Sequence, residues 1–157
     1  FVHERFANDS SLKRLQGWWG HDKQSRFQMK SEFVPIPGVE GWQLSNPPIF
    51  SLLPLRASLE IFRDAGMESL RLKSKSLTGY LEFLLSKKAG VQVLTPKDPE
   101  ARGCQLSLNI AGGREVFKKL TEQGVVCDWR EPDVIRVSPV PLYNTYSDVF
   151  RFAELLS

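Results

Sequence analysis

Residues 67–86 carry an apolar stripe with helical spacing, and this stripe constrains the fold more than any other feature of the chain. Apolar side chains that recur every three or four residues form one face of an α-helix and need a core to pack against. The members of the stripe are Leu70, Leu77, Tyr80, Leu81, Leu84 and Leu85. The residues that follow must supply the layer that covers this face.

The residues after the stripe alternate between strand and helix patterns. Short β-branched and apolar runs predict strands at 91–94, 104–110, 125–127 and 134–137. Helical patterns are predicted over 114–123 and 147–156. The order β-β-α-β-β-α after a long helix indicates an α/β fold with a small sheet covered by helices.

The first third of the chain is less regular. We expect a short strand over residues 1–5, a short helix over 11–15 and a further helix from Leu55 that ends at Gly66. Between them, residues 17–48 bring together adjacent tryptophans, a histidine, a Ser-Asn pair and four prolines. Such a composition predicts a shaped loop, and loops held on a rigid scaffold often carry function.

The bulk composition excludes several classes of protein. At 157 residues with 41% hydrophobic side chains, the chain can bury a core of its own. A net charge of +3 does not imply nucleic-acid binding, and no apolar run is long enough for a membrane span. Two isolated cysteines fit no metal spacing and favour a reduced, cytoplasmic setting. The start at Phe1, without a secretory signal, suggests the interior of a longer protein.

Arg136 is the strongest single candidate for a binding residue, because it interrupts the apolar run from Val134 to Val137. One interpretation is bidentate capture of a substrate carboxylate by the planar guanidinium. The alternatives are an internal ion pair, or an edge strand on which the arginine faces water. Residue types alone favour these alternatives.

Other candidates lie in the loop at 17–48. Trp18 and Trp19 would point in different directions in extended backbone, so one indole is expected to pack while the other presents its N–H or ring to a ligand. Asn46 could donate its amide to a ligand or cap a helix, and His21 could be a base, a ligand or a loop hydrogen-bonder. No complete catalytic set, P-loop or Gly-x-Gly-x-x-Gly motif accompanies them.

Several ordered blocks together give the chain a resemblance to kynureninase, from Phe1 to the C-terminus. The blocks are Gly17-Trp18-Trp19-Gly20-His21, Arg26-Phe27-Gln28-Met29, Ile36-Pro37-Gly38-Val39, Gln43-Leu44-Ser45-Asn46-Pro47-Pro48-Ile49, Arg102-Gly103-Cys104-Gln105-Leu106 and Ile135-Arg136-Val137-Ser138-Pro139-Val140-Pro141-Leu142-Tyr143-Asn144. The chain resembles only the C-terminal part of that longer, pyridoxal-phosphate-dependent enzyme of the aspartate-aminotransferase fold.

The resemblance implies a domain layout. Residues 1–54 would end the large cofactor domain, residues 55–90 would form linking helices, and residues 91–157 would form the small C-terminal α/β domain of a fold type I enzyme. The family cleaves kynurenine or 3-hydroxykynurenine to anthranilate or 3-hydroxyanthranilate and alanine, in tryptophan catabolism and NAD biosynthesis. Pyridoxal 5'-phosphate serves as the electron sink.

The resemblance also implies roles for individual residues. Trp18 matches the tryptophan whose indole N–H reaches the cofactor phosphate, and Asn46 matches an asparagine of the cofactor and substrate pocket. Arg136 matches the arginine that binds the α-carboxylate of the amino acid. Trp19, His21 and Ser45 would also contact the substrate. Because the family builds its site at a homodimer interface, Trp18 and Asn46 would serve the cofactor of the neighbouring subunit.

The Schiff-base lysine of the family corresponds to a position upstream of Phe1, and no lysine of this chain occupies its motif. Covalent catalysis requires that amine, so we expect this chain alone to carry no catalytic residue and to be inactive. A non-catalytic domain, one chain of a split enzyme, and another pyridoxal-phosphate lyase or transaminase are the alternatives. The sequence implies neither nucleic acid, membrane nor metal as a partner.

Overall fold

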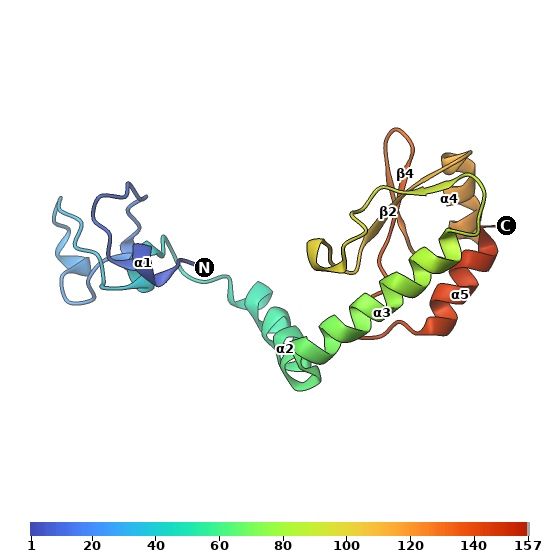
Figure 1. Cartoon of the computed structure of the whole chain (residues 1–157). Coiled ribbons are helices and arrows are strands. Elements are labelled where there is room, and N and C mark those ends of the chain that lie inside the picture. The colour runs from blue at the N-terminus through green and yellow to red at the C-terminus, as the bar shows by residue number, and fades with distance from the viewer. Residues whose placement is uncertain (157) are drawn as a thin grey trace. The chain divides into compact units, whose positions relative to one another are not determined.

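The computed structural model describes residues 1–156, which divide into two compact units. The first unit is Phe1–Ala57 and the second begins at Ser58, so each is treated by itself (Figure 1). The finer division into residues 1–54, 55–90 and 91–157 stays a prediction.

The first unit consists of short turns of helix joined by irregular chain. They are α1 (Glu4–Ala7), the 3₁₀ turns η1 (Trp18–Gly20), η2 (Arg26–Gln28) and η3 (Val39–Trp42), and the beginning of α2 (Ile49–Ala65). Because no regular element longer than four residues lies between positions 17 and 48, the predicted shaped loop is confirmed.

Two predictions for the first unit are wrong. Residues 4–7 form a helix where a strand was expected, because the His3 side chain caps it by accepting a hydrogen bond from the Arg5 N–H. Residues 11–15 form no helix, because Asp9 Oδ1 accepts hydrogen bonds from both the N–H and the hydroxyl of Ser11 and closes a local turn. Local side-chain bonds of this kind compete with helix formation.

Two long helices follow, α2 (Ile49–Ala65) and α3 (Met67–Leu85). Gly66 separates them with a φ of 78°, a left-handed conformation that favours glycine. The predicted helix at 67–86 is confirmed, and the predicted helix from Leu55 begins six residues earlier, at Ile49, and contains Pro54. No helix among the described residues is long and apolar enough to cross a membrane.

The second unit contains an antiparallel sheet of four strands in the order β1-β2-β4-β3. The strands are β1 (Val91–Val93), β2 (Leu106–Ile110), β3 (Asp128–Arg130) and β4 (Val134–Val137). In this register Arg136 lies opposite both Ser107 of β2 and Asp128 of β3. The edge-strand interpretation of Arg136 is therefore wrong, because β4 is an inner strand.

The predicted strand at 125–127 is also wrong, because β3 begins three residues later. The apolar run there favoured a strand, yet Val126 is fully exposed and Val125 is bonded to the end of the preceding helix through its N–H to the Leu120 carbonyl. The tight β3–β4 hairpin, with only residues 131–133 between its strands, sets the observed position.

Helices cover one face of the sheet, as predicted. The core joins leucines of α3, Leu120 of α4 (Gly113–Glu122) and Phe152 of α5 (Tyr146–Leu155) to the inward residues of β2 and β4. Strand residues alternate between the two faces. The opposite face, here called the polar face, carries Gln92, Ser107, Asn109, Asp128, Arg130 and Arg136.

Candidate functional site

The Trp18–Trp19 pair is held as a small aromatic cluster in the first unit. The two indoles meet edge to face with ring centroids 6.2 Å apart, and Phe27 packs against Trp18 at 5.3 Å. Trp18 is nevertheless half exposed, whereas Trp19 is partly buried. Within residues 1–156 the Trp18 indole N–H has no hydrogen-bond partner, so it is available to a ligand.

Two glycines bring this cluster against the segment that precedes Ser45. A Cβ on Gly17 would lie 2.1 Å from the Leu44 Cα, and one on Gly20 would lie 2.7 Å from the Gly41 carbonyl oxygen. Both distances are too short for any side chain. The close backbone approach at Gly17 therefore places the tryptophan pair beside the chain that leads into Ser45 and Asn46.

Arg26 connects the parts of the tryptophan segment. Its Nη2 donates to the Trp19 carbonyl at 2.7 Å and to the His21 carbonyl at 3.1 Å. Its guanidinium also lies over both indoles, 5.0 Å from the Trp19 ring and 5.6 Å from the Trp18 ring. Such cation–π contacts add to the hydrogen bonds and fix the backbone between the two tryptophans and His21.

His21 takes part in a local hydrogen-bond network. Its Nδ1 accepts from the Val34 N–H at 3.3 Å, so in the neutral ring Nε2 carries the proton and faces the Ser25 hydroxyl at 3.2 Å. Ser25 in turn donates to Asp22 Oδ2 at 2.8 Å, and this bond holds the pKa of Asp22 below its usual range. Of the roles left open by the sequence, the described contacts match a loop hydrogen-bonder.

Ser45 and Asn46 lie exposed at the end of the first unit. The Ser45 carbonyl accepts from the Gln43 side chain at 3.1 Å, which orders the turn before Asn46. Among the described residues the Asn46 amide makes no hydrogen bond and caps no helix, since α2 begins only at Ile49. Its donors and acceptor remain free.

In the second unit, Arg136 forms an ion pair with Asp128 on the polar face. Arg136 Nε donates to Asp128 Oδ2 at 2.8 Å, and Nη2 donates to the same oxygen. Arg130 approaches that oxygen as well, with Nη2 at 3.1 Å. The hydrogen bond from Arg136, ahead of the charge of Arg130, holds the pKa of the Asp128 carboxyl below its usual range. Two guanidinium groups share one carboxylate, so the cluster keeps a net positive charge.

Asp128, Arg130 and Arg26 belong to these clusters although the sequence analysis gave them no role. Asp128 was missed because the strand was predicted three residues too early, at 125–127, which hid its register with Arg136. A hairpin centred on Glu131-Pro132-Asp133 would have placed the two side chains opposite each other. Arg26 offered no such signal, because its partners are carbonyl groups of an irregular loop.

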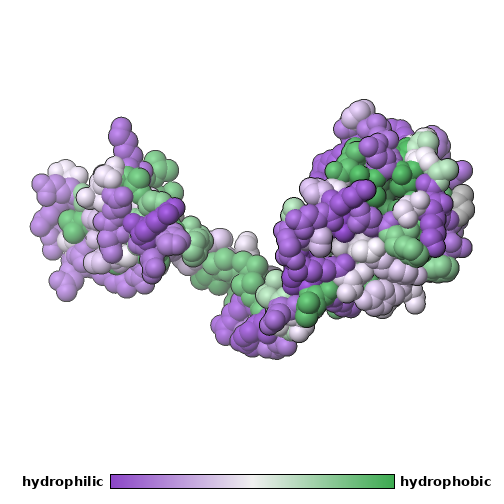
Figure 2. Space-filling view, viewed as in Figure 1, coloured by the Kyte–Doolittle hydropathy of each residue, from purple (hydrophilic) through white to green (hydrophobic). Residues whose placement is uncertain are grey.

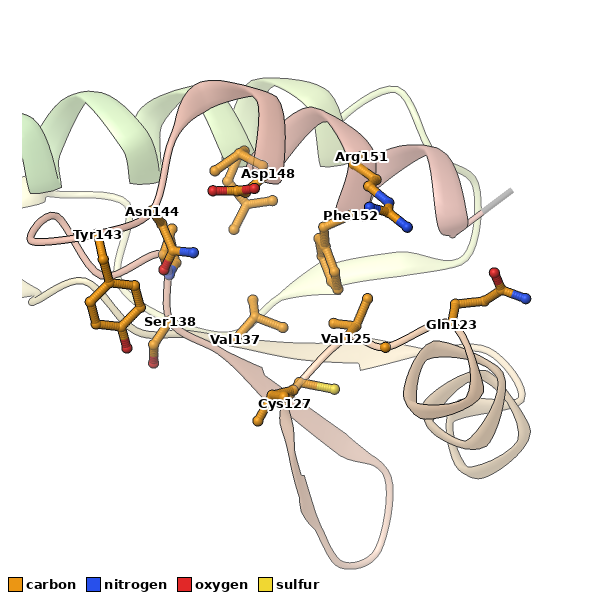
Figure 3. A pocket seen from close by; sticks show the side chains of 15 residues that line it. Gln123, Val125, Cys127, Val137, Ser138, Tyr143, Asn144, Asp148, Arg151 and Phe152 are labelled. Atoms are coloured by element: carbon orange, nitrogen blue, oxygen red, sulfur yellow. The ribbon is translucent and has the colours of Figure 1, made fainter.

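A separate cavity of about 590 Å³ lies on the helix side of the sheet. Val125, Val137 and Phe152 line its apolar wall, as Figure 3 shows, and polar groups of α5 stand at its rim. Asp148 at that rim is engaged with Thr145 as part of the α5 capping box. Burial raises the pKa of the Cys127 thiol, which also lines the cavity. The cavity contains none of the predicted site residues.

Comparison with solved structures identifies the fold. The cystine C-S lyase C-DES, in complex with cysteine persulfide, matches with a TM-score of 0.77 at 18% identity over 100% of this chain and 41% of its own. The cysteine desulfurase CsdA from Escherichia coli matches with a TM-score of 0.71 at 22% identity, over 90% of this chain and 37% of its own. The fold is that of the C-terminal part of fold type I pyridoxal-phosphate enzymes, as predicted.

The sequence comparisons then give the family. Residues 70–156 match the model of the kynureninase C-terminal domain. Kynureninase from Koribacter versatilis is 56% identical over 98% of this chain, and that from Stenotrophomonas maltophilia is 58% identical over 98%. The chain belongs to the kynureninase family. It spans 37% and 38% of the lengths of these two relatives.

Proposed function

We propose that the whole protein is a kynureninase that uses pyridoxal phosphate to cleave kynurenine or 3-hydroxykynurenine, in tryptophan catabolism and NAD biosynthesis in the cytoplasm. Family membership and kynureninase relatives that match nearly the whole chain support this proposal. The structural observation that carries it is Arg136, an arginine on the polar face with a side chain 30% exposed. Such a group can receive a carboxylate from solvent.

Pyridoxal phosphate, when bound, supplies the electron sink for bond cleavage at the amino-acid carbons. The first unit offers groups that fit it: the free indole N–H of Trp18 suits a phosphate oxygen, and the free amide of Asn46 suits a polar atom of cofactor or substrate. The Trp18 N–H would hold the phosphate as a neutral donor. Rings packed around Trp18 keep that donor in place without taking up its hydrogen bond.

Arg136 would bind the α-carboxylate and so orient the amino acid for cleavage. Trp19, His21 and Ser45 would contact the rest of the substrate, with Trp19 offering a ring face for the aromatic group. Arg26 would position this side of the site, because it bonds both the Trp19 and His21 carbonyls. We further propose that the site forms in a homodimer, in which Trp18 and Asn46 serve the neighbouring subunit.

If the whole protein is a kynureninase, its Schiff-base lysine would lie outside residues 1–157. We therefore predict that this chain, mixed with pyridoxal phosphate alone, does not release anthranilate from kynurenine. A borohydride-reducible lysine adduct together with turnover by this chain would contradict the prediction. It would also show that a lysine within these residues serves the reaction.

The Arg136 assignment is tested in the full-length protein. Arg136→Ala removes the carboxylate's partner, and we expect kcat/KM for kynurenine to fall at least about tenfold, since hydrogen bonds to charged groups are the strong ones. Arg114→Ala is the matched control, because Arg114 is an exposed arginine of the same sheet domain that pairs with Glu131. Unchanged kinetics for Arg136→Ala would remove the carboxylate assignment.

Trp18→Phe tests the phosphate contact. Phenylalanine keeps ring packing against Phe27 but removes the indole N–H, so the affinity for pyridoxal phosphate should fall about tenfold, the worth of one charge-assisted hydrogen bond. Equilibrium dialysis of the full-length protein measures this affinity directly. Trp42→Phe is the control, because the Trp42 indole N–H donates to the Ala7 carbonyl. Equal affinities in the wild type and Trp18→Phe would contradict the assignment.

A further inference from the structure

We propose that Asp128 is the positioning residue for Arg136, holding its guanidinium so that the terminal edge faces the substrate carboxylate. The inference rests on the proposed function, because it needs Arg136 to be the carboxylate-binding group. It adds a residue that neither the sequence nor the family comparison assigns. Three independent features of the hairpin support it.

The first feature is the register of the hairpin. Asp128 and Arg136 are directly paired across β3 and β4, so their side chains leave the sheet on the same face. Directly opposed residues of antiparallel strands have Cβ atoms about 4.5–5.5 Å apart. The aspartate therefore reaches the Nε side of the guanidinium across the strand pair.

The second feature is the choice of donors. Asp128 uses Nε and Nη2 of Arg136, both through its Oδ2 oxygen. Nη1 has no hydrogen-bond partner among the described residues, and the second N–H of Nη2 points along the same terminal edge. A guanidinium can bind one carboxylate on its Nε side and another at its Nη1–Nη2 end. Asp128 therefore orients Arg136 without occupying the edge that a substrate would use.

The third feature is the charge of the cluster. If Asp128 neutralised Arg136 alone, the site would have little attraction for an anion. Arg130 also contacts Asp128, so two cations face one anion and the Arg130–Asp128–Arg136 cluster stays positive. If Asp128 positions Arg136, removing the Asp128 carboxylate should weaken substrate binding. If Asp128 instead competes with the substrate for Arg136, removing it should strengthen substrate binding.

The test uses the full-length holoenzyme with Asp128→Ala, Asp128→Glu and Arg136→Ala. We expect Asp128→Ala to raise the KM for kynurenine about tenfold with a change in kcat below about threefold, because ground-state and transition-state binding are lost alike. Asp128→Glu keeps a carboxylate and should recover part of the affinity. In the Arg136→Ala background, adding Asp128→Ala should change KM no further.

Glu131→Gln is the matched control. Glu131 lies in the same hairpin as Asp128 but pairs with Arg114 of α4 and does not contact Arg136. The KM of this variant should equal that of the wild type. Melting curves of each variant show whether the domain still folds. If Asp128→Ala does not fold, the KM of Asp128→Glu still tests the proposal.

The outcomes separate the two proposals. If Arg136→Ala weakens substrate binding but Asp128→Ala leaves KM unchanged or lowers it, the positioning role is overturned and the proposed function stands. An equal further loss from Asp128→Ala in the Arg136→Ala background would overturn it too. If Arg136→Ala itself has wild-type kinetics, the carboxylate assignment of the proposed function fails.

Discussion

Gly17 sets how closely the tryptophan pair approaches the chain before Asn46. Any side chain here would meet the Leu44 backbone, whose nearest atom lies only 2.1 Å from a Cβ built on the glycine. Flexible side chains can move aside, but backbone cannot do so without breaking its own contacts. The position of Trp18 therefore depends on Gly17, a residue that has no side chain with which to contact a ligand.

We expect Gly17→Ala to destabilise the first unit by about 3 kcal/mol, the upper range for overpacking. Tryptophan fluorescence during urea unfolding reports mainly on this unit, since three of the four tryptophans, Trp18, Trp19 and Trp42, belong to it. Gly103→Ala is the control, because nothing lies within 4 Å of a Cβ there. Equal unfolding midpoints for the two variants would show that the 17–44 approach is not formed in solution.

At the scale of elements, α2 differs from every other long helix in having no buried residue. Phe50 is 92% exposed and Ile49, Leu53 and Leu59 are each more than half exposed. In Figure 2 the hydrophobic colour gathers over the first part of this helix, whereas its end is hydrophilic. Exposed apolar patches of this kind mark protein–protein contact surfaces. The patch on α2 is therefore consistent with contacts to the second subunit of the proposed dimer or to the rest of a longer enzyme.

Residues 1–157 alone should therefore self-associate through α2. Leu53→Lys places a charge on the exposed apolar surface, so we expect it to lower both the apparent mass in light scattering and the binding of a hydrophobic dye. Ser76→Lys, at an exposed position of α3, is the control and should leave both unchanged. A monomeric wild-type chain with no dye binding would contradict this interpretation of α2.

The elements also show what sequence patterns can and cannot predict. The helix at 67–86 is predicted correctly because its apolar residues recur with helical spacing and pack on one side against a single core. The strand at 128–130 was missed because hairpin register, rather than a hydrophobic run, decides its position, and its Asp-Trp-Arg sequence contains a single apolar residue. The side chains of the candidate site follow the same division: Arg136 interrupts an apolar pattern, whereas Arg26 and Asp128 depend on tertiary partners.

Across the whole molecule, several aspartates are stabilised in their charged form by hydrogen bonds. The pKa values of Asp22, Asp128 and Asp148 are lowered by bonds from Ser25, Arg136 and Thr145 respectively. An aspartate whose pKa is lower in the folded state than in the unfolded state, where it is about 3.9, stabilises the fold at pH values above about 3.9. This stabilisation is lost as the pH falls through the folded-state pKa. The chain should therefore lose stability in acid below about pH 4.

Asp22→Asn isolates one of these contributions. The variant should melt at a lower temperature than the wild type at pH 7. The difference should be smaller at pH 3, because the carboxyl is then largely protonated in the unfolded chain and the stability from its lowered folded pKa is being lost. Differential scanning calorimetry at both pH values measures it. A difference that stays constant or grows in acid would show that the Ser25–Asp22 bond does not carry the effect.

The central claim for the whole molecule is that residues 1–157 form the C-terminal part of a kynureninase. The most direct measurement is product analysis of the full-length protein incubated with pyridoxal phosphate and kynurenine. We predict anthranilate and alanine in equal amounts, with simple amino acids left uncleaved. Formation of a keto acid by transamination, or intact kynurenine after prolonged incubation with cofactor-loaded protein, would contradict the claim.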